Sequence, residues 1–201
     1  MTTTYPLKER EDIEAVKKYL LNKKKKNEQR LDENNKRNYL LFMIGISSAL
    51  RISDILSLKV SDLTTDGRRA SKFIVVQEQK TKKTKRFAVS INLRRAIEDY
   101  LVEYKPDLDD YVFQTSMVKT KTMTRHRAYQ ILKDALEETG MSYVKFGTHG
   151  MRKTFAYHLW KQNTDITYIM RLLNHSSPKE TLRYITVEQD ELDEIYVNLN
   201  L

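Results

Sequence analysis

The spacing of apolar residues constrains the fold of this chain more than any other feature of its sequence. Ile13, Val16 and Leu20 recur at helical intervals, and the apolar run at 39–50 predicts a second, more fully buried helix. Asn92 is the expected N-cap of a later helix, and Gly140 the left-handed residue that ends another. Further helices are predicted at 93–104, 125–138, 149–162, 165–173, 178–185 and 188–199.

One segment departs from this helical spacing. Residues 72–91 contain KFIVVQE and RFAVSI, which are rich in β-branched and aromatic residues and flank the polar tip KTKKTK. Such a pattern predicts a β-hairpin. The expected fold class is therefore α+β, mostly α-helical with a small antiparallel β-sheet.

The charge of the chain favours a polyanionic partner without identifying one. The 36 Lys and Arg residues outnumber the 27 Asp and Glu residues, which gives a formal net charge of +9. Basic surfaces bind phosphates by releasing counterions, but ribosomal and membrane-surface proteins share this property. The sequence has no cysteine, which excludes disulfides, thiolate zinc sites and cysteine nucleophiles.

The sequence predicts a single cytoplasmic domain spanning 1–201. Its length suits one ordinary core, and no internal repeat or linker rich in Pro and Gly divides it. The N-terminus lacks a signal-peptide pattern, and the longest apolar stretch, around 40–50, is too short to span a bilayer. We therefore expect no membrane partner.

A tight link between two helices is predicted after Leu173. Asn174 tolerates the positive φ that ends a helix, so it is the expected cap. Ser177 and Glu180 have capping-box spacing, and Pro178 suits a first helical turn. His175 is thus expected to be held rigidly between the helices.

Two polar pairs are not explained by core packing. Arg51 and Asp54 are three residues apart, as are His149 and Arg152, so each pair shares a helical face. Taken alone, the first pair is a surface ion pair. His149 in isolation is equally compatible with a hydrogen-bonded interior histidine.

Taken in order, four segments resemble the signature series of the tyrosine recombinases, the family of phage integrases and chromosome-dimer resolution recombinases. These segments are ALRISDILSLKVSDL, the hairpin VVQEQKTKKTKRFAV, THGMRKTFA and LLNHSSPKETLRYI. The match covers roughly residues 7–190, and the joint order is specific although each piece alone is a weak signal. Asn174 and Lys82 depart from the pattern, because the family usually has Gly there. Neither departure removes a reacting group.

The resemblance implies a catalytic domain that cuts and rejoins DNA through a 3′-phosphotyrosine, without a metal, ATP or another cofactor. Tyr184 would be the nucleophile. Arg51 and Arg152 would hold the non-bridging oxygens of the scissile phosphate. His175 would donate a further hydrogen bond, and His149 would help to accept the tyrosine proton.

The hairpin carries four lysines that compete for the role of general acid. Alignment with the family pattern selects Lys80 to protonate the leaving 5′ oxygen, and Lys82, Lys83 and Lys85 are interpreted as phosphate contacts. Asp54 matches a family position that is usually acidic. We expect it to orient Arg51 or a nearby lysine.

A second basic segment precedes a predicted helix. KTKTMTRHR places Lys119, Lys121, Arg125 and Arg127 just before and within the first turn. Cations there oppose the helix dipole, a cost that a nearby phosphate would offset. DNA contact and simple surface charge both remain open.

The remaining tyrosines and histidines have structural interpretations. Tyr157, Tyr168 and Tyr196 lie at core-like spacing and are expected to pack. His126 and His158 have no ligand partners at useful spacing, so no metal site is predicted.

The resemblance also bears on organisation and partners. Only about one helix precedes the match, so the N-terminal DNA-clamp domain of most tyrosine recombinases is not expected. The chain is then either a fragment or a short recombinase similar to the single-domain fimbrial-switch enzymes. Implied partners are double-stranded DNA, further protomers that convert a free monomer into a tetrameric synapse, and accessory DNA-bending proteins. The acidic segment 187–201 carries an apolar stripe, which predicts a tail helix packed on its own domain or on a neighbouring protomer.

Three functions compete at this level. They are a site-specific recombinase of a mobile element, a DNA-binding regulator that keeps the fold but lacks turnover, and a related phosphotyrosine topoisomerase. Retention of all reacting groups favours an enzyme over a regulator, and the missing clamp disfavours a topoisomerase. The target site and the choice among integration, excision and inversion cannot be inferred from the sequence.

Overall fold

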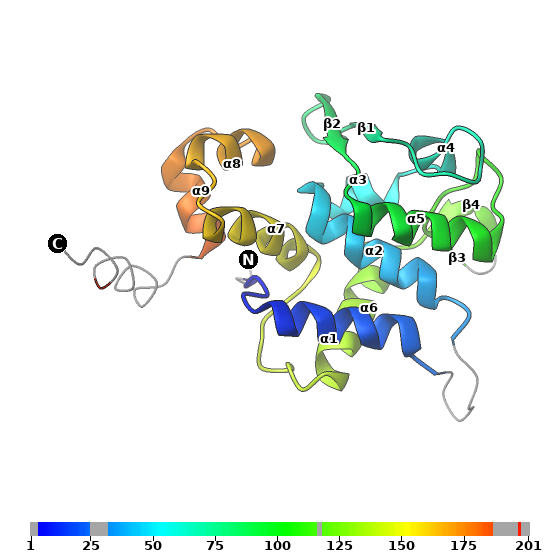
Figure 1. Cartoon of the computed structure of the whole chain (residues 1–201), viewed down its shortest axis with the longest axis horizontal. Coiled ribbons are helices and arrows are strands. Elements are labelled where there is room, and N and C mark those ends of the chain that lie inside the picture. The colour runs from blue at the N-terminus through cyan, green and yellow to red at the C-terminus, as the bar shows by residue number, and fades with distance from the viewer. Residues whose placement is uncertain (1–3, 25–31, 116–117, 187–196, 198–201) are drawn as a thin grey trace.

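The computed structural model describes residues 4–24, 32–115, 118–186 and 197, with the backbone alone at 118–120. Figure 1 shows the mostly α-helical α+β fold that the sequence predicted. The helices are α1 (Arg10–Asn22), α2 (Asn35–Ser48), α3 (Ile52–Leu56), α4 (Val60–Leu63), α5 (Ile91–Tyr104), α6 (Arg125–Glu138), α7 (Thr148–Lys161), α8 (Ile166–Leu173) and α9 (Pro178–Ile185). The strands are β1 (Phe73–Gln77), β2 (Thr84–Ala88), β3 (Gln114–Thr115) and β4 (Val118–Thr122).

Helix α2 forms the centre of the main core. Its residues Leu40, Leu41 and Ile44 are fully buried, and α1, α5 and α7 all pack against it. The apolar run around 39–50 therefore has the buried position that its composition predicts. The helix begins at Asn35 and ends at Ser48, because Ala49 takes a left-handed conformation with φ 54°.

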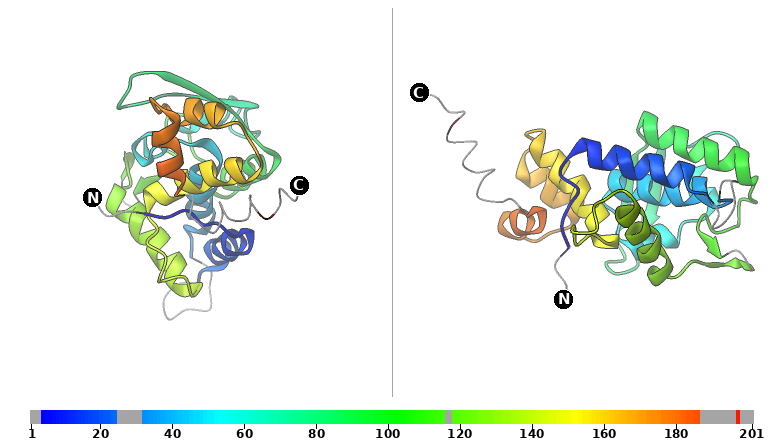
Figure 2. Two further views of the ribbon diagram at one scale, coloured as in Figure 1. Left: turned by 90° about the vertical axis from the view of Figure 1, so that its left-hand side faces the viewer. Right: turned by 90° about the horizontal axis from the view of Figure 1, so that it is seen from below.

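A second, smaller core lies at the C-terminal side of the described chain. Ala156 and Tyr157 from α7 pack there with Ile169 and Leu173 from α8 and Ile185 from α9. Figures 1 and 2 show that these three helices form one end of the molecule. Because α7 also packs on α2, it joins the two cores.

The predicted hairpin is confirmed as an antiparallel pair of β1 and β2. Phe73 pairs with Ala88 and Gln77 with Thr84. Along β1, Ile74 and Val76 are buried while their neighbours are exposed, the alternation expected of a strand with one face on a core. The second hairpin, β3 with β4, was not predicted, because its short polar strands lack that alternation.

Several helix ends follow the local sequence. Gly140 is left-handed with φ 77°, as predicted. The N-cap of α5 is Ser90, whose hydroxyl accepts the N–H of Leu93, so the prediction of Asn92 was wrong by two residues. The predicted tail helix at 188–199 lies outside the described residues, apart from Val197.

The close approach of α2 and α7 generates a stability prediction. A Cβ on Gly45 would lie 2.9 Å from Cβ of Met151 and would also overlap its Sδ. We expect Gly45→Ala to lower the free energy of unfolding by about 1–3 kcal/mol, because neither helix can move without disturbing a core. Urea unfolding measures this change. If steric overlap is the cause, adding Gly45→Ala to Met151→Ala should cost no further stability.

Candidate active site

Four parts of the chain supply the predicted catalytic residues, and they meet where the two cores join. Arg51 precedes α3, the hairpin supplies lysines, His149 and Arg152 lie on α7, and the α8–α9 segment carries His175 and Tyr184. In Figure 1 the hairpin and α3 lie beside the end formed by α7, α8 and α9.

Arg51 is ion-paired with a residue that the sequence analysis did not select. Its Nη1 lies 3.2 Å from Oε1 of Glu78, whose side chain is fully buried. Asp54 is also fully buried, and its Oδ1 accepts the backbone N–H of Gln79 at 2.9 Å. The interpretation of Arg51 and Asp54 as a surface ion pair was therefore wrong. Asp54 instead holds the hairpin next to Lys80.

Arg152 connects three elements through its guanidinium group. Nη1 donates to the carbonyl of Ala49, and Nη2 donates to the carbonyl of Leu173. Both carbonyls lie at helix C-termini, where the helix dipole favours a cation. Burial lowers the pKa of Arg152, but a guanidinium keeps its charge in proteins.

His149 lies on α7 one turn before Arg152. Burial, followed by the charge of Arg152, lowers its pKa below the ordinary histidine value. The imidazole is consequently neutral at pH 7, the form that can accept a proton. His158 lies further along the helix with Nε2 3.0 Å from the carbonyl of Leu7, which agrees with its structural interpretation.

The turn before α9 has the conformation that the sequence predicted. Asn174 is left-handed with φ 52°, and the hydroxyl of Ser177 accepts the N–H of Glu180. Glu180 itself accepts the N–H of Ser176, so the reciprocal half of the expected capping box is shifted by one residue. The local sequence therefore gives α9 a defined start.

His175 is held on two sides in this turn. Its Nδ1 lies 3.1 Å from the hydroxyl oxygen of Thr181. Its ring contacts the Tyr184 ring edge-on, with the centroids 5.0 Å apart. Burial lowers the pKa of His175.

Tyr184 has its hydroxyl inside the site rather than in solvent. The oxygen is buried beside Arg152, without a hydrogen bond of normal geometry among the described residues. Burial raises the pKa of Tyr184, and the charge of Arg152 offsets part of the rise. Nζ of Lys153 lies 5.2 Å from the ring centroid, a cation–π distance.

The lysines of the hairpin divide into two groups. Lys80, Lys82 and Lys83 are exposed at the turn, where Lys82 is left-handed with φ 57°. Lys85 was interpreted from the sequence as a phosphate contact, but its Nζ donates to the carbonyls of Ala49 at 3.2 Å and Leu172 at 2.8 Å. Burial, with the neighbouring Arg152, lowers the pKa of Lys85 to about 8. Within the described residues, the hairpin cation next to Arg152 is thus Lys85.

Several buried polar atoms at this site have no hydrogen-bond partner among the described residues. In the described part of the chain, the buried polar atoms without a hydrogen bond include Arg51 Nη1, Asp54 Oδ2, Glu78 Oε1 and Tyr184 Oη. Buried polar groups are normally satisfied, so such a cluster marks a place where a polar ligand completes the network. The donors among them suit an anion.

Glu78 carried a sequence signal that was not used. It follows Ile74 and Val76 at alternate positions, which places it on the buried face of the strand. A carboxylate on an apolar face requires a cation or several hydrogen-bond donors. The signal therefore pointed to a polar site beside the hairpin.

The candidate DNA contacts outside the hairpin are in part exposed. Lys121, Arg125 and Arg127 are exposed at the end of β4 and the start of α6, and the side chain of Lys119 lies outside the described residues. Thr124 caps α6 by accepting the N–H of Arg127. These cations are available to a phosphate backbone.

The other tyrosines were predicted with mixed success. Tyr157 is buried as expected, whereas Tyr168 is 60% exposed on α8, so its predicted packing was wrong. Tyr196 lies outside the described residues.

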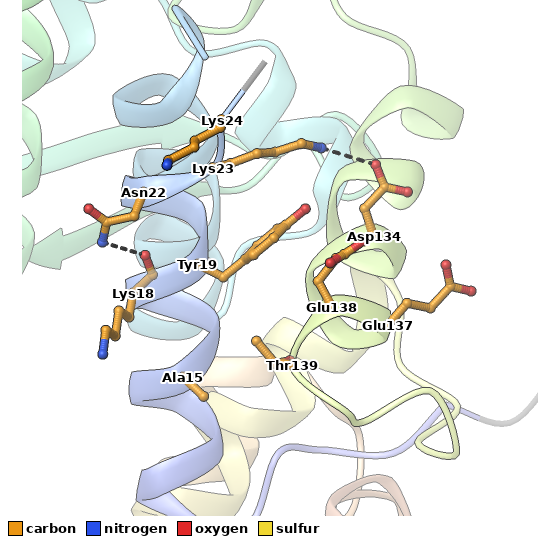
Figure 3. A pocket seen from close by; sticks show the side chains of 10 residues that line it. All are labelled: Ala15, Lys18, Tyr19, Asn22, Lys23, Lys24, Asp134, Glu137, Glu138 and Thr139. Atoms are coloured by element: carbon orange, nitrogen blue, oxygen red, sulfur yellow. Dashed lines mark hydrogen bonds and ion pairs between the residues drawn. The ribbon is translucent and has the colours of Figure 1, made fainter. Parts of the chain in front are cut away.

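Two further properties concern only the described residues. They contain no group of three or more His, Cys, Asp or Glu residues arranged to hold a metal ion, and no helix long and apolar enough to cross a membrane. A pocket of about 810 Å³ opens between α1 and α6, where Lys23 pairs with Asp134 beside Tyr19 (Figure 3). None of the predicted catalytic residues lines it.

The comparisons with known proteins identify the family. The model of the phage integrase family matches residues 5–191. The chain belongs to this family. It is 38% identical to the probable integrase/recombinase YoeC of Bacillus subtilis, over 94% of this chain and 93% of that protein.

Other members of the phage integrase family are longer. Identity to the tyrosine recombinase XerD of Mycobacterium tuberculosis is 28% over 80% of this chain and 51% of that protein, so the chain spans about half the length of such relatives. The crystal structure of XerA recombinase superimposes with a TM-score of 0.74 at 19% identity, covering 100% of this chain and 67% of that one. The family resemblance and the fold predicted from the sequence are both confirmed.

The partly buried Lys85 predicts a pH dependence of stability. Because the pKa of Lys85 is lowered to about 8, the folded protein binds this proton more weakly than the unfolded chain does. The cost of burying the ammonium is complete below pH 8 and disappears as the pH rises towards the ordinary lysine pKa of 10.5. Relative to Lys85→Met, the wild-type free energy of unfolding should rise between about pH 8 and about pH 10.5, by at most about 3 kcal/mol. Urea titrations across this range test the slope, and a constant difference would contradict the buried lysine.

Proposed function

We propose that this chain is a site-specific DNA recombinase that cuts and rejoins duplex DNA through a 3′-phosphotyrosine at Tyr184. The observation that carries the proposal is the convergence on Tyr184, where Arg152 lies beside the buried hydroxyl and the His175 ring packs against the phenol. Arg152 is on α7 and Tyr184 is on α9, so only the fold brings these two side chains together. Membership of the phage integrase family supports the same chemistry.

The proposed reaction is a transesterification in two steps. The Tyr184 oxygen attacks the scissile phosphorus and loses its proton, while the 5′ oxygen of the next nucleotide leaves and gains one. The bond from phosphorus to the 5′ oxygen is exchanged for a bond to the Tyr184 oxygen. The tyrosyl ester keeps the free energy of the broken bond, so a 5′ hydroxyl of another strand can reverse the step without ATP. Neither step changes an oxidation state or requires a cofactor.

The two arginines are proposed to stabilise the charge of the phosphorane. Arg152 has two of its donors on the carbonyls of Ala49 and Leu173, which fix the plane of the guanidinium before DNA binds. Arg51 is held by its ion pair with Glu78, in which Nη1 lies 3.2 Å from Oε1. Preorganised cations of this kind stabilise developing negative charge more effectively than flexible ones.

The two histidines are proposed to transfer a proton and to bind the scissile phosphate. His149, neutral at pH 7 because its pKa is lowered, is suited to accept the tyrosine proton. His175 is proposed to donate a hydrogen bond to a non-bridging oxygen from a turn that fixes its ring. Its contact with the Tyr184 ring supports a joint placement of donor and nucleophile.

Lys80 is proposed as the general acid, and Lys85 as a fixed structural cation. Lys80 occupies the hairpin position that the family resemblance selects, and its exposure leaves it available to bound DNA. Both donated hydrogen bonds of Lys85 end on backbone carbonyls, which suits a cation that holds elements together. Asp54, through Gln79, anchors the segment next to Lys80.

Double-stranded DNA and further protomers are the proposed partners. The exposed side chains of Lys82, Lys83, Lys121, Arg125 and Arg127 support phosphate contacts, and Lys119 stays a prediction. Among similar folds, XerH recombinase has been solved bound to a palindromic difH substrate, and lambda integrase as a dimer bound to a core site. We propose that this chain likewise acts as several protomers on DNA, as a tetrameric synapse assisted by DNA-bending proteins.

Covalent trapping tests the proposed nucleophile. A nicked duplex carrying the target site should give a covalent complex that resists denaturant, in chelator and without ATP. Tyr184→Phe should lower the rate of covalent trapping by at least about a thousandfold, because the attacking oxygen is lost. The variant should still bind the DNA. Tyr168→Phe, an exposed tyrosine on α8, is the matched control and should trap normally.

The same assay separates the competing functions. Binding without trapping by the wild-type chain would indicate a regulator, and relaxation of supercoiled DNA without a specific site would indicate a topoisomerase. A covalent adduct that persists in Tyr184→Phe would exclude this residue as the nucleophile.

Replacing the leaving oxygen by sulfur tests the general acid. A 5′-bridging phosphorothiolate leaves without protonation, so it should restore cleavage by Lys80→Ala by about a hundredfold or more relative to the oxygen substrate. Lys85→Ala should show little rescue, because its defect lies in the arrangement of the site. Strong rescue of Lys85→Ala with none for Lys80→Ala would reverse the two assignments.

A further inference from the structure

The carboxylate of Glu78 contacts three separate parts of the active site. Its Oε1 faces Nη1 of Arg51 at 3.2 Å. Its Oε2 accepts hydrogen bonds from the Thr81 hydroxyl at 2.6 Å and from Nδ2 of Asn174 at 2.9 Å. Arg51 is itself a proposed catalytic group, whereas Thr81 adjoins Lys80 and Asn174 adjoins His175.

We propose that Glu78 is a positioning residue that joins Arg51, the hairpin turn bearing Lys80 and the turn bearing His175, with Asn174 as its partner across the site. The proposal rests on the recombinase function proposed above. Glu78 is not proposed to touch DNA, because its side chain is fully buried. It acts through the residues it holds.

The ionised state of Glu78 favours a positioning role over a role in packing alone. Burial acts to raise the pKa of Glu78, but the Thr81 hydroxyl and Arg51 outweigh it, and the pKa lies below the ordinary value. A buried ionised carboxylate is stable only while its cation and donors stay in place. Displacing the hairpin or the His175 turn therefore costs free energy, so the catalytic groups are held in one arrangement.

The backbone conformation of Asn174 allows the role of its side chain to be tested separately from the turn. Its φ of 52° is one that glycine adopts without strain and other residues rarely adopt. A glycine would serve the backbone equally well, so the turn alone does not require an asparagine. The side chain supplies the hydrogen bond to Glu78, which joins two segments 96 residues apart in the sequence.

A second contact joins the hairpin to the end of α8, beside the hydrogen bond between Glu78 and Asn174. Lys85, from β2, donates to the carbonyl of Leu172, two residues before Asn174. Lys85 can hold the hairpin against the end of α8 when the Glu78–Asn174 hydrogen bond is removed. Loss of that bond should therefore change the placement of His175 without unfolding the protein.

Asn174→Gly is the decisive variant, because it removes the side chain and keeps the left-handed backbone. We expect its covalent trapping rate at saturating protein to fall about tenfold, with DNA affinity within about twofold and the melting temperature nearly unchanged. Glu78→Gln should fall further, since Arg51 also loses its ion pair. Glu103→Gln removes a carboxylate paired with Lys36 away from the site and is the matched control.

A double-mutant cycle establishes that the two residues act together. If Glu78 works through Asn174, the variant Glu78→Ala/Asn174→Gly should trap no more slowly than Glu78→Ala alone. Independent, multiplicative losses would overturn the proposal, as would a wild-type trapping rate for Asn174→Gly. A rate loss matched by an equal loss of affinity or folding would also overturn it.

A measurement without DNA tests the positioning role of Glu78 and Asn174 separately from the proposed recombinase function. Burial lowers the pKa of His175 in the folded protein, so releasing its turn in Asn174→Gly should move that pKa towards the ordinary value in an NMR titration. An unchanged His175 pKa would reject the positioning role even if the wild-type chain recombines DNA. Failure of the wild-type chain to form a covalent complex, with the His175 shift present, would reject the function alone.

Discussion

The two hydrogen bonds from the Arg152 guanidinium to the carbonyls of Ala49 and Leu173 tie the active site to both cores. Ala49 ends the central helix of the main core, and Leu173 ends a helix of the second core. If Arg152 were absent, the Leu173 carbonyl would lose its side-chain donor and the Ala49 carbonyl would keep only Lys85, and leaving a buried acceptor unpaired is costly. Lys85 donates to the carbonyls of Ala49 and Leu172, so it links the ends of the same two helices beside Arg152.

The balance of buried charge around Arg152 favours an anion. Arg51, Arg152 and Lys85 bring three cations to the junction, and Asp54 and Glu78 bring two carboxylates. The carboxylates hold the hairpin and Arg51 in place while leaving an excess of positive charge. This excess of positive charge would attract a scissile phosphate, so binding and preorganisation arise from the same network.

Several residues beside these groups have a left-handed backbone conformation. Ala49, Lys82 and Asn174 all have positive φ, and each lies within two residues of a proposed catalytic group: Arg51, Lys80 and His175 respectively. Left-handed residues other than glycine cost free energy that the surrounding structure must supply. At Asn174 the hydrogen bond to Glu78 is such a compensation, and the structure gives no comparable contact for the Lys82 side chain.

The sequence by itself determined the described helices of eight residues or more, the β1–β2 hairpin and the family, because each depends on short-range periodicity or on motif order. The short helices α3 and α4 were not predicted, because four or five residues are too few to show a periodicity. Asn174, Ser177 and Pro178 specify their turn through local backbone preferences, and His175 and Tyr184 could be selected from their spacing alone. The error of two residues at the N-cap of α5 has the same origin, since Ser90 and Asn92 are equally good local caps. Local signals place elements well and their ends less well.

Only the tertiary structure decided which side chains meet. Arg51 pairs with Glu78 across 27 positions rather than with Asp54 on its own helix, and Lys85 rather than Lys80 reaches the carbonyls near Arg152. The sequence alone does not distinguish the four lysines of the hairpin. Their contacts differ because strand register sets which of them is partly buried and which faces backbone carbonyls. Those are long-range properties of packing, which no spacing along the chain encodes.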